Sequence, residues 1–350
     1  MLLTDFRTLG RSGLVVSPLA LGTMTFGAPR WGTSDEVSRA IFNAYVDAGG
    51  NFIDAADIYS GGHCEELLGR FVADRHLRDQ VVLATKYTWN ATQNPNAGGS
   101  GRKNIYRALE GSLKRLQTDY VDLYWMHAWD MVTPAEEVLQ TLGDLVRAGK
   151  IRYFGLSGVP AWYMTQLALL AQFHGVPGPI ALQPEYSLTE RSIEREHVPA
   201  ARALGLGVVP WSPLAGGFLA GKYERGNSGT QASGEGRLSG PNPLGDTKFT
   251  DQNWRVLDAL RAVAGPLDRP LAQVALAWAL AQPGISSLLL GASKVAQLHD
   301  NLAALTVQLT AKQLQTLDQV SALELVHPYM IFTPQVNRSI FGGHAVQGWR

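Results

Sequence analysis

The sequence predicts a (β/α)8 barrel. Short runs of β-branched or aliphatic residues recur along the 350-residue chain, and each is followed by an amphipathic segment that ends near Gly or Pro. This alternation indicates parallel strands joined by crossover helices. Eight such strands at a regular spacing favour a barrel, a fold that routinely exceeds the usual domain size. A doubly wound open sheet is the alternative, but its usual marker, a GxGxxG turn after the first strand, is missing.

The predicted strands and helices follow one another in a regular order. The strands span residues 18–22, 50–54, 81–86, 121–127, 151–157, 179–183, 206–211 and 287–291. The helical patterns span residues 34–48, 64–75, 104–117, 134–149, 160–173, 194–204 and 294–304. Two of these helices carry clear start and stop signals: Ser34 opens an apolar stripe that ends at Gly49, and Thr133 with Pro134 opens another that ends at Gly149.

Three segments lie outside this repeat. Residues 7–16 resemble a hairpin that would plug the bottom of the barrel. Residues 212–250 are rich in Gly, Ser, Asn and Pro, and we expect a long mobile loop at the barrel mouth. A helix, "TAKQLQTLDQV", and an irregular tail follow residue 305. Because these additions sit outside one core, residues 1–350 are expected to form a single barrel domain.

Composition excludes several classes of function. Lys plus Arg and Asp plus Glu each number 30, so no basic or acidic face points to nucleic acid or to an anionic membrane. The N-terminus, "MLLTDFRTLG", does not resemble a secretory signal, and no apolar run reaches membrane-spanning length. Cys64 is the only cysteine, which excludes an internal disulfide and fits the cytoplasm. We expect a small-molecule partner, and a homo-oligomer is compatible with the sequence.

Polar residues stand at the ends of three successive predicted strands. Asp54 ends the second strand and Tyr59 follows five residues later, Lys86 ends the third strand and His127 ends the fourth. The carboxyl ends of barrel strands meet at one mouth, so these four side chains are expected to converge. An ammonium beside a phenol would lower the phenol pKa, and a carboxylate would hold the ammonium. Such a group can protonate an oxygen that becomes negative, but it lacks a nucleophile.

Each of these residues, taken singly, also has a structural explanation. A lysine at a strand end is usually solvated or salt-bridged, a loop tyrosine usually packs, and a histidine after "YWM" is usually a core residue. Their joint occurrence favours the catalytic interpretation. The other histidines show no metal-ligand spacing with acidic or cysteine partners, so no metal site is expected.

The sequence resembles the aldo-keto reductase family over nearly its whole length. The matching motifs are "LALGTMTFG" at 19–27, "NFIDAADIYSGGHCEELLGR" at 51–70, "VLATKY" at 82–87, "SLKRLQTDYVDLYWMH" at 112–127, "LVRAGKIRYFGLSG" at 145–158, "VVPWSPLAGGFLAGKY" at 208–223 and "LLGASKVAQLHDN" at 289–301. The stretch from 101 to 130 is most similar to the aryl-alcohol dehydrogenase-like branch.

This resemblance implies a (β/α)8 barrel that binds NADPH and reduces aldehydes or ketones to alcohols, reversibly. The catalytic residues of the family fall on Asp54, Tyr59, Lys86 and His127, with Tyr59 as the proton donor. The resemblance implies no metal.

Cofactor contacts are carried over from the resemblance position by position. At the nicotinamide end they fall on Gly22, Thr23, Met24, Asp54, Ser157, Gln183 and Trp211. At the pyrophosphate they fall on Ser212, Pro213, Leu214, Gly216 and Lys222, in a Gly-rich turn suited to anions. At the 2′-phosphate and adenine they fall on Gly291, Ser293, Lys294, Gln297, Asp300 and Asn301.

The chain departs from the family pattern at three positions. Gly158 stands where many relatives have Asn, and Pro184 follows Gln183. Gln297 stands where many members place an arginine near the 2′-phosphate. These departures weaken one carboxamide contact and the strictness of NADP over NAD.

Tryptophans are predicted to shape the substrate pocket. Trp31, Trp89 and Trp129 lie in mouth loops, where they would wall an apolar or planar pocket, with simple loop packing as the alternative. Trp125 and Trp162 are expected in the core.

A second function is kept open beside the reductase. A cofactor-sensing regulatory subunit, like the channel β-subunits built on this fold, would keep the same four residues with little turnover. A barrel lyase or isomerase is disfavoured because it would not explain the segment 289–301.

Overall fold

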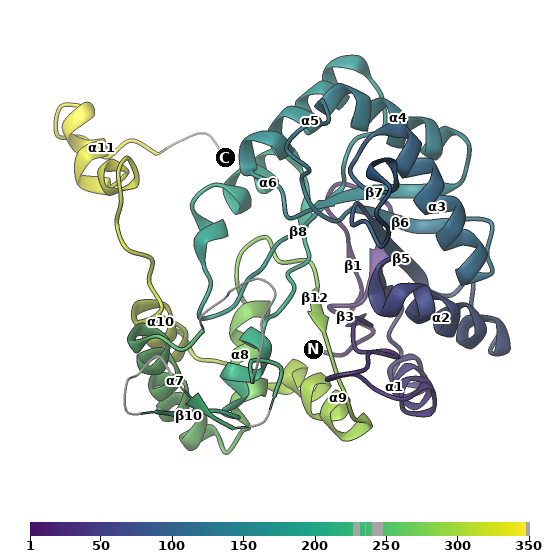
Figure 1. Ribbon diagram of the computed structural model, residues 1–350. Helices are drawn as coiled ribbons and strands as arrows, with labels where there is room; N and C mark the ends of the chain where they lie inside the picture. Colours follow the sequence, from purple (N-terminus) through teal and green to yellow (C-terminus); the bar gives the residue numbers. More distant parts are fainter. Residues whose placement is uncertain (227–231, 235, 240–247, 348–350) are drawn as a thin grey trace.

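Eight parallel strands form the sheet of the protein (Figure 1). The structure, a computed structural model, describes residues 1–226, 232–234, 236–239 and 248–347. The strands are β3 (Leu19–Gly22), β4 (Phe52–Asp54), β5 (Val82–Tyr87), β6 (Val121–Met126), β7 (Ile151–Ser157), β8 (Ala181–Gln183), β9 (Gly207–Val208) and β12 (Leu288–Leu290). Each coincides with a predicted strand, so the predicted order of strands is confirmed.

The sheet closes into a barrel. The strand order is β12-β3-β4-β5-β6-β7-β8-β9, with every neighbouring pair parallel. The two outer strands of this order also meet, because the backbone N–H of Ser286 donates to Val208 O at 2.8 Å and that of Leu289 donates to Pro210 O at 2.9 Å. The predicted (β/α)8 barrel is therefore confirmed.

Helices surround the strands as predicted. They are α1 (Asp35–Asp47), α2 (His63–Asp74), α3 (Arg102–Leu116), α4 (Ala135–Arg147), α5 (Ala161–His174), α6 (His197–Leu204) and α9 (Val295–Leu302). The Ser34 side chain accepts from the Val37 backbone N–H and caps α1 as predicted. Short 3-10 turns lie at η1 (Tyr59–Gly62), η2 (Pro95–Ala97), η3 (Ser192–Glu194), η5 (Gly265–Leu267) and η6 (Ala303–Thr306).

Two helices between β9 and β12 are not predicted by the sequence pattern. They are α7 (Asp251–Ala264) and α8 (Leu271–Leu280), which lead from β9 to β12 and pack on each other. Helix α8, "LAQVALAWAL", is apolar on every side and mostly buried. A helix without a polar face shows no amphipathic period, and this is why it escapes pattern analysis.

The barrel interior is a core of its own. It contains Phe52, Val82, Ala84, Leu123, Trp125, Ala181, Val209 and Leu289, all buried. Gly155 on β7 is required here, since a methyl group at this position would collide with the Trp125 ring. Trp125 is thus a core residue, as predicted.

The N-terminal hairpin closes the bottom of the barrel. Strands β1 (Arg7–Thr8) and β2 (Val15–Val16) pair antiparallel, and Leu9 packs into the interior core. Gly10 has φ +60°, and a Cβ there would stand 2.5 Å from Ile180 O. Only glycine permits this approach to the barrel floor, so the predicted plug is confirmed.

The segments 212–250 and 305–350 contain more regular structure than expected. The first holds η4 (Ala215–Ala220), β10 (Glu224–Arg225) and β11 (Ala232–Ser233), while the predicted loop at 227–231, 235 and 240–247 lies outside the described residues. The second holds the predicted helix as α10 (Ala311–Val320), then η7 (Tyr329–Ile331) and α11 (Pro334–Ile340). The tail is therefore partly helical.

Trp162 does not lie in the core. It is on α5 and is 56% exposed, so its predicted core position is wrong. The apolar character of α5 continues around its outer face, which misleads a prediction from composition. Among the residues that the structure describes, no helix combines the length and the apolar character needed to span a bilayer.

Candidate active site

The alternation of side chains along the strands places the predicted residues at the mouth. Successive residues of a strand point to opposite faces. Ala20, Ala84, Trp125, Ala181, Val209 and Leu289 belong to the interior core. Two positions further toward the carboxyl ends of these strands come Gly22, Lys86, His127, Gln183, Trp211 and Gly291. The mouth layer is thus built from predicted catalytic and cofactor residues.

Asp54, Lys86 and Tyr59 are joined by hydrogen bonds. The Lys86 ammonium donates to the Asp54 carboxylate, to Ala55 O at 2.8 Å and to the Tyr59 hydroxyl at 3.2 Å. Asp54 and Lys86 are buried, with side chains no more than 2% exposed. Gln183 donates from Nε2 to the other Asp54 oxygen at 3.0 Å. All the protons of the ammonium therefore have acceptors, and one acceptor is the phenol.

Burial and charge act against each other in this group. Burial raises the pKa of the Asp54 carboxyl, while the Lys86 ammonium lowers it. Burial alone would lower the pKa of Lys86, but the Asp54 carboxylate and the Tyr59 phenol outweigh it, and the pKa of Lys86 lies above its ordinary value. Lys86 therefore stays charged at neutral pH.

The net pKa of Tyr59 differs from the prediction. Burial raises the pKa of this phenol, and the opposing effect of Lys86 is the smaller of the two. Lys86 acts in the expected direction, but the expected lowering of the pKa does not result. Tyr59 is therefore a protonated phenol at neutral pH, with an ammonium on its oxygen.

His127 joins the group by ring contacts. Its imidazole meets the Tyr59 ring edge to face, with the ring centroids 5.9 Å apart. Burial, together with the Lys86 charge, lowers the pKa of His127 well below its ordinary value, so the ring is neutral at neutral pH. Nδ1 is buried without a hydrogen-bond partner in the described part of the chain. The four predicted catalytic residues are thus brought together.

The residues predicted to contact the nicotinamide are joined to one another by hydrogen bonds. The Thr23 hydroxyl donates to Asp54 O at 2.8 Å, and the Ser157 hydroxyl donates to Gln183 O at 2.8 Å. The Thr23 hydroxyl also lies 3.1 Å from the sulfur of Cys64, which is buried. Thr23 and Ser157 therefore position the mouth layer through their hydroxyls.

Glycines open space at the mouth beside Asp54. Strands β3 and β12 are neighbours, and they end at Gly22 and just before Gly291, respectively. A Cβ at Gly291 would meet no atom within 4 Å. Trp211 lies half-buried at the same layer and is anchored by its backbone to Pro184 and Tyr186. The end of β12 is therefore open at Gly291, whereas a Cβ at Gly22 would lie 3.4 Å from Leu290 O.

The Gly-rich turn after Trp211 adopts a special backbone. Ser212 has φ +55° and Gly216 has φ +65°. The Ser212 hydroxyl accepts from the Gly216 N–H at 3.3 Å, across Pro213 and Leu214. Lys222 returns over this turn, with its Nζ 3.9 Å from the Cβ position of Gly217. The structure thus brings one cation to the turn.

The residues predicted for the 2′-phosphate and adenine separate into two groups. Lys294 is the exposed N-cap of α9, and Asp300 is exposed further along it. The Gln297 side chain accepts from the Ser293 N–H at 2.9 Å and so serves the helix start. Asn301 is buried, with its Nδ2 unpartnered, and it does not face solvent with Lys294.

Of the three predicted substrate-pocket tryptophans, one contacts the catalytic group. Trp89 is 48% exposed and meets His127 edge to face, with centroids 6.2 Å apart. Trp129 packs instead on Trp162 and Tyr163 of α5. Trp31 lies under the Arg237 guanidinium, 5.0 Å from the ring centroid.

Arg237 is a residue that sequence reasoning missed. It follows β11, its Nη2 lies 3.9 Å from Met24 Sδ, and Leu238 packs on Gly216. Burial lowers the pKa of Arg237, and the nearby Tyr59 raises it by a smaller amount. The side chain is nevertheless exposed. The only available signal was one arginine in an irregular loop, which has no period from which to place it.

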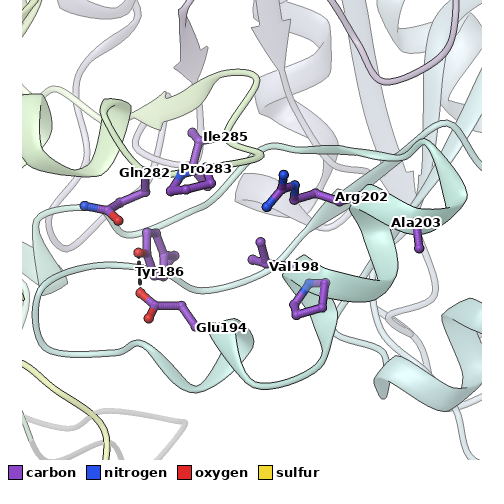
Figure 2. A pocket seen from close by; sticks show the side chains of 9 residues that line it. Tyr186, Glu194, Val198, Arg202, Ala203, Gln282, Pro283 and Ile285 are labelled. Atoms are coloured by element: carbon purple, nitrogen blue, oxygen red, sulfur yellow. Dashed lines mark hydrogen bonds between the residues drawn. The ribbon is translucent and has the colours of Figure 1, made fainter. Parts of the chain in front are cut away.

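Two cavities within the described residues lie outside the hydrogen-bonded group of Asp54, Lys86 and Tyr59. One of about 700 Å³ lies between α6 and residues 282–285 (Figure 2). Another of about 120 Å³ lies behind Trp89, lined by Asp57, Arg107 and Arg115. No cluster of three or more His, Cys, Asp or Glu suited to a metal occurs in the described ranges.

Comparisons with known proteins agree with this geometry. The model of the Aldo/keto reductase family matches residues 18–322. The Bacillus subtilis oxidoreductase YrpG is 38% identical, covering 90% of this chain and 95% of its own. A probable voltage-gated potassium channel subunit beta from Oryza sativa subsp. japonica is 38% identical, over 87% and 92%. The aryl-alcohol dehydrogenase [NADP(+)] of Phanerodontia chrysosporium is 31% identical, over 91% and 86%. The chain belongs to the aldo/keto reductase family of oxidoreductases.

Proposed function

We propose that this protein is an NADPH-dependent carbonyl reductase that converts an aldehyde or ketone into an alcohol, reversibly. The observation that carries the proposal is the buried Lys86 ammonium, which is shared between the Asp54 carboxylate and the Tyr59 hydroxyl. A cation on the oxygen of a protonated phenol favours release of the phenol proton to a developing alkoxide.

Each catalytic residue has one role in this proposal. Tyr59 donates its proton to the carbonyl oxygen, and Lys86 stabilises the phenolate that remains. Asp54 keeps Lys86 charged and in position. The neutral His127 ring, with its proton on Nε2, donates a hydrogen bond that orients the carbonyl. NADPH, when bound, supplies the hydride to the carbonyl carbon.

The residues at the mouth fit a dinucleotide. The open position at Gly291 leaves space for the nicotinamide ring, and we place Trp211 beside the ring and Gln183 and Ser157 near its amide. Lys222 and Lys294 form no salt bridge within the described residues, and Arg237 has only a longer-range interaction with Glu185 there. We assign Lys222 and Arg237 to the pyrophosphate and Lys294 to the 2′-phosphate.

The substrate class is proposed from the walls of the mouth. The exposed Trp89 ring stands beside His127, which suits a planar or bulky apolar carbonyl compound. The name of the aryl-alcohol dehydrogenase relative points to aromatic substrates for that protein. We extend this class to the present chain.

A steady-state survey of aromatic and aliphatic aldehydes and ketones, with NADPH and NADH in parallel, tests the function. We expect turnover with NADPH and higher kcat/KM for aromatic carbonyl compounds. The rice relative named as a channel subunit supports the alternative of a cofactor-sensing subunit. Tight NADPH binding without turnover on any carbonyl compound would decide for that alternative.

Lys294→Met is expected to change the choice of cofactor. Loss of one charge-assisted hydrogen bond to the 2′-phosphate should lower kcat/KM for NADPH by roughly 10- to 100-fold. The value for NADH should stay the same, because NADH lacks this phosphate. Lys312→Met, which removes an exposed charge on α10, is the matched control. Equal losses with both cofactors would remove Lys294 from the phosphate site.

A further inference from the structure

The C-terminal residues form an arm that leaves the barrel. We define the arm as residues 324–347, which include η7 and α11. In Figure 1, α11 stands apart from the barrel at the end of a connecting segment. No residue of η7 or α11 is buried. The helix is nevertheless well formed, since the Thr333 side chain accepts from the Val336 N–H at 3.2 Å and caps it.

The arm concentrates exposed apolar side chains. Eight of the nineteen large apolar side chains exposed in the described part lie between residues 325 and 346. Phe332 is 69% and Ile340 is 70% exposed. Exposed apolar side chains gathered in one segment commonly mark an interaction site.

A second apolar patch lies on α5. Trp162, Leu169 and Phe173 are exposed on its outer face, and Phe173 is 85% exposed. Their spacing of seven and four residues places them on one side of the helix. We call these three residues the α5 stripe. A surface helix normally presents polar residues outward, so the stripe also lacks a cover.

The arm begins next to the face that carries the stripe. Glu324 O accepts from Arg195 Nη2 at 2.9 Å, and the Tyr329 hydroxyl donates to Glu196, just before α6. Helix α6 packs against α5. The cavity of Figure 2 lies along α6 and is lined in part by Val198 and Ala203. One side of the molecule therefore offers both the apolar arm and a receiving surface, which consists of the α5 stripe and of the cavity, whose lining also includes Glu194 and Arg202.

We propose that the arm of one chain docks on the α5 stripe and on the cavity along α6 of a second copy, and that the arm of that copy docks in return, to form a two-fold dimer. In a two-fold contact each copy must present both partner surfaces, and only a face with both can close. The start of the arm, at Glu324 and Tyr329, lies on the same side of the molecule as the α5 stripe, so one face presents both surfaces. If the arm bound a different protein, this chain would not need an exposed apolar surface that fits its own arm.

The apolar area is sufficient for a stable dimer. Eight side chains with roughly half of about 150–250 Å² exposed each give roughly 800 Å² per arm. Two arms give roughly 1,600 Å², which is the size of a standard specific interface before the covered α5 and α6 surfaces are counted.

The molar mass in solution, from light scattering after size exclusion, tests the proposal. The wild-type chain should have about twice its mass of 37.9 kDa. Phe332→Asp with Phe341→Asp in the arm, or Phe173→Asp in the stripe, should raise the dimer Kd at least roughly 100-fold. Leu2→Asp, an exposed position elsewhere, should leave the dimer unchanged.

A cross-link identifies the contact. Cys64 is the only native cysteine and is buried, so Phe341→Cys and Phe173→Cys introduce single accessible thiols. Mixing these two variants under mild oxidation should give a disulfide-linked pair, whereas either variant alone should give less.

Three results would overturn the proposal. The first is a wild-type chain that stays monomeric at ~100 µM, where a standard interface is saturated. The second is a dimer unchanged by both the arm and the stripe variants. The third is wild-type binding to phosphatidylcholine vesicles, lost in Phe341→Asp, without a dimer, which would assign the arm to lipid.

Discussion

Tyr59→Phe is expected to lower kcat/KM for carbonyl reduction by about 10²- to 10⁴-fold, the usual contribution of a positioned general acid. The hydroxyl accepts a hydrogen bond from Lys86 at 3.2 Å, and no other phenol contacts this ammonium within the described residues. Among the described residues, no second phenol therefore lies on the ammonium to replace Tyr59 as the acid.

The NADPH affinity of Tyr59→Phe tells whether a loss of turnover comes from the missing proton donor or from a damaged cofactor site. Quenching of tryptophan fluorescence should give the same NADPH affinity for Tyr59→Phe as for the wild type, because the ring remains in place. Tyr106→Phe on α3 is the matched control and should keep full turnover. Normal turnover in Tyr59→Phe would refute its role as the acid.

Lys86→Met is expected to destabilise the fold and abolish turnover together. The substitution leaves the Asp54 carboxylate buried without its cation, and breaking one partner of a buried pair costs about 3–5 kcal/mol. Without the ammonium, burial raises the pKa of Asp54 further, so Asp54 becomes protonated in the folded state at acid pH. A raised folded-state pKa gives stability that is present below the unfolded value and lost as pH rises. Urea unfolding should therefore show a larger loss at pH 8 than at pH 5.

The double variant Asp54→Asn with Lys86→Met isolates the catalytic loss. It removes both charges, so most of the stability should return at pH 8, while turnover should stay as low as in Lys86→Met. If the double variant is as unstable as Lys86→Met, the loss of stability comes from altered packing and not from the unpaired Asp54 charge. Recovery of turnover with stability would show that Lys86 acts only on the fold.

The catalytic group could be predicted because its signal is local. Asp54, Lys86 and His127 stand at or just beyond the ends of short apolar strands, and strand period and barrel closure bring such positions together. The N-terminal hairpin could also be predicted, because residues 7–16 have a hairpin-like pattern outside the strand repeat.

Other features depend on contacts between segments that lie far apart in the sequence, and these contacts leave no local pattern. Helix α8 is apolar on all sides because it is buried between elements, so it has no period to detect. Gln297 serves the start of α9, and Arg237 reaches Met24 and Trp31 from a loop without periodicity.

The amino-acid sequence by itself determined the barrel, the order of its strands and the four residues at its mouth, because these follow from local alternation and from the common end of parallel strands. Only the tertiary structure decided the charge state of the site. Whether burial or the neighbouring ammonium prevails at Tyr59 depends on how many atoms surround the phenol, and burial prevails. It also decided which apolar surfaces remain uncovered, since exposure is a property of the packed chain and Trp162 shows that composition does not reveal it.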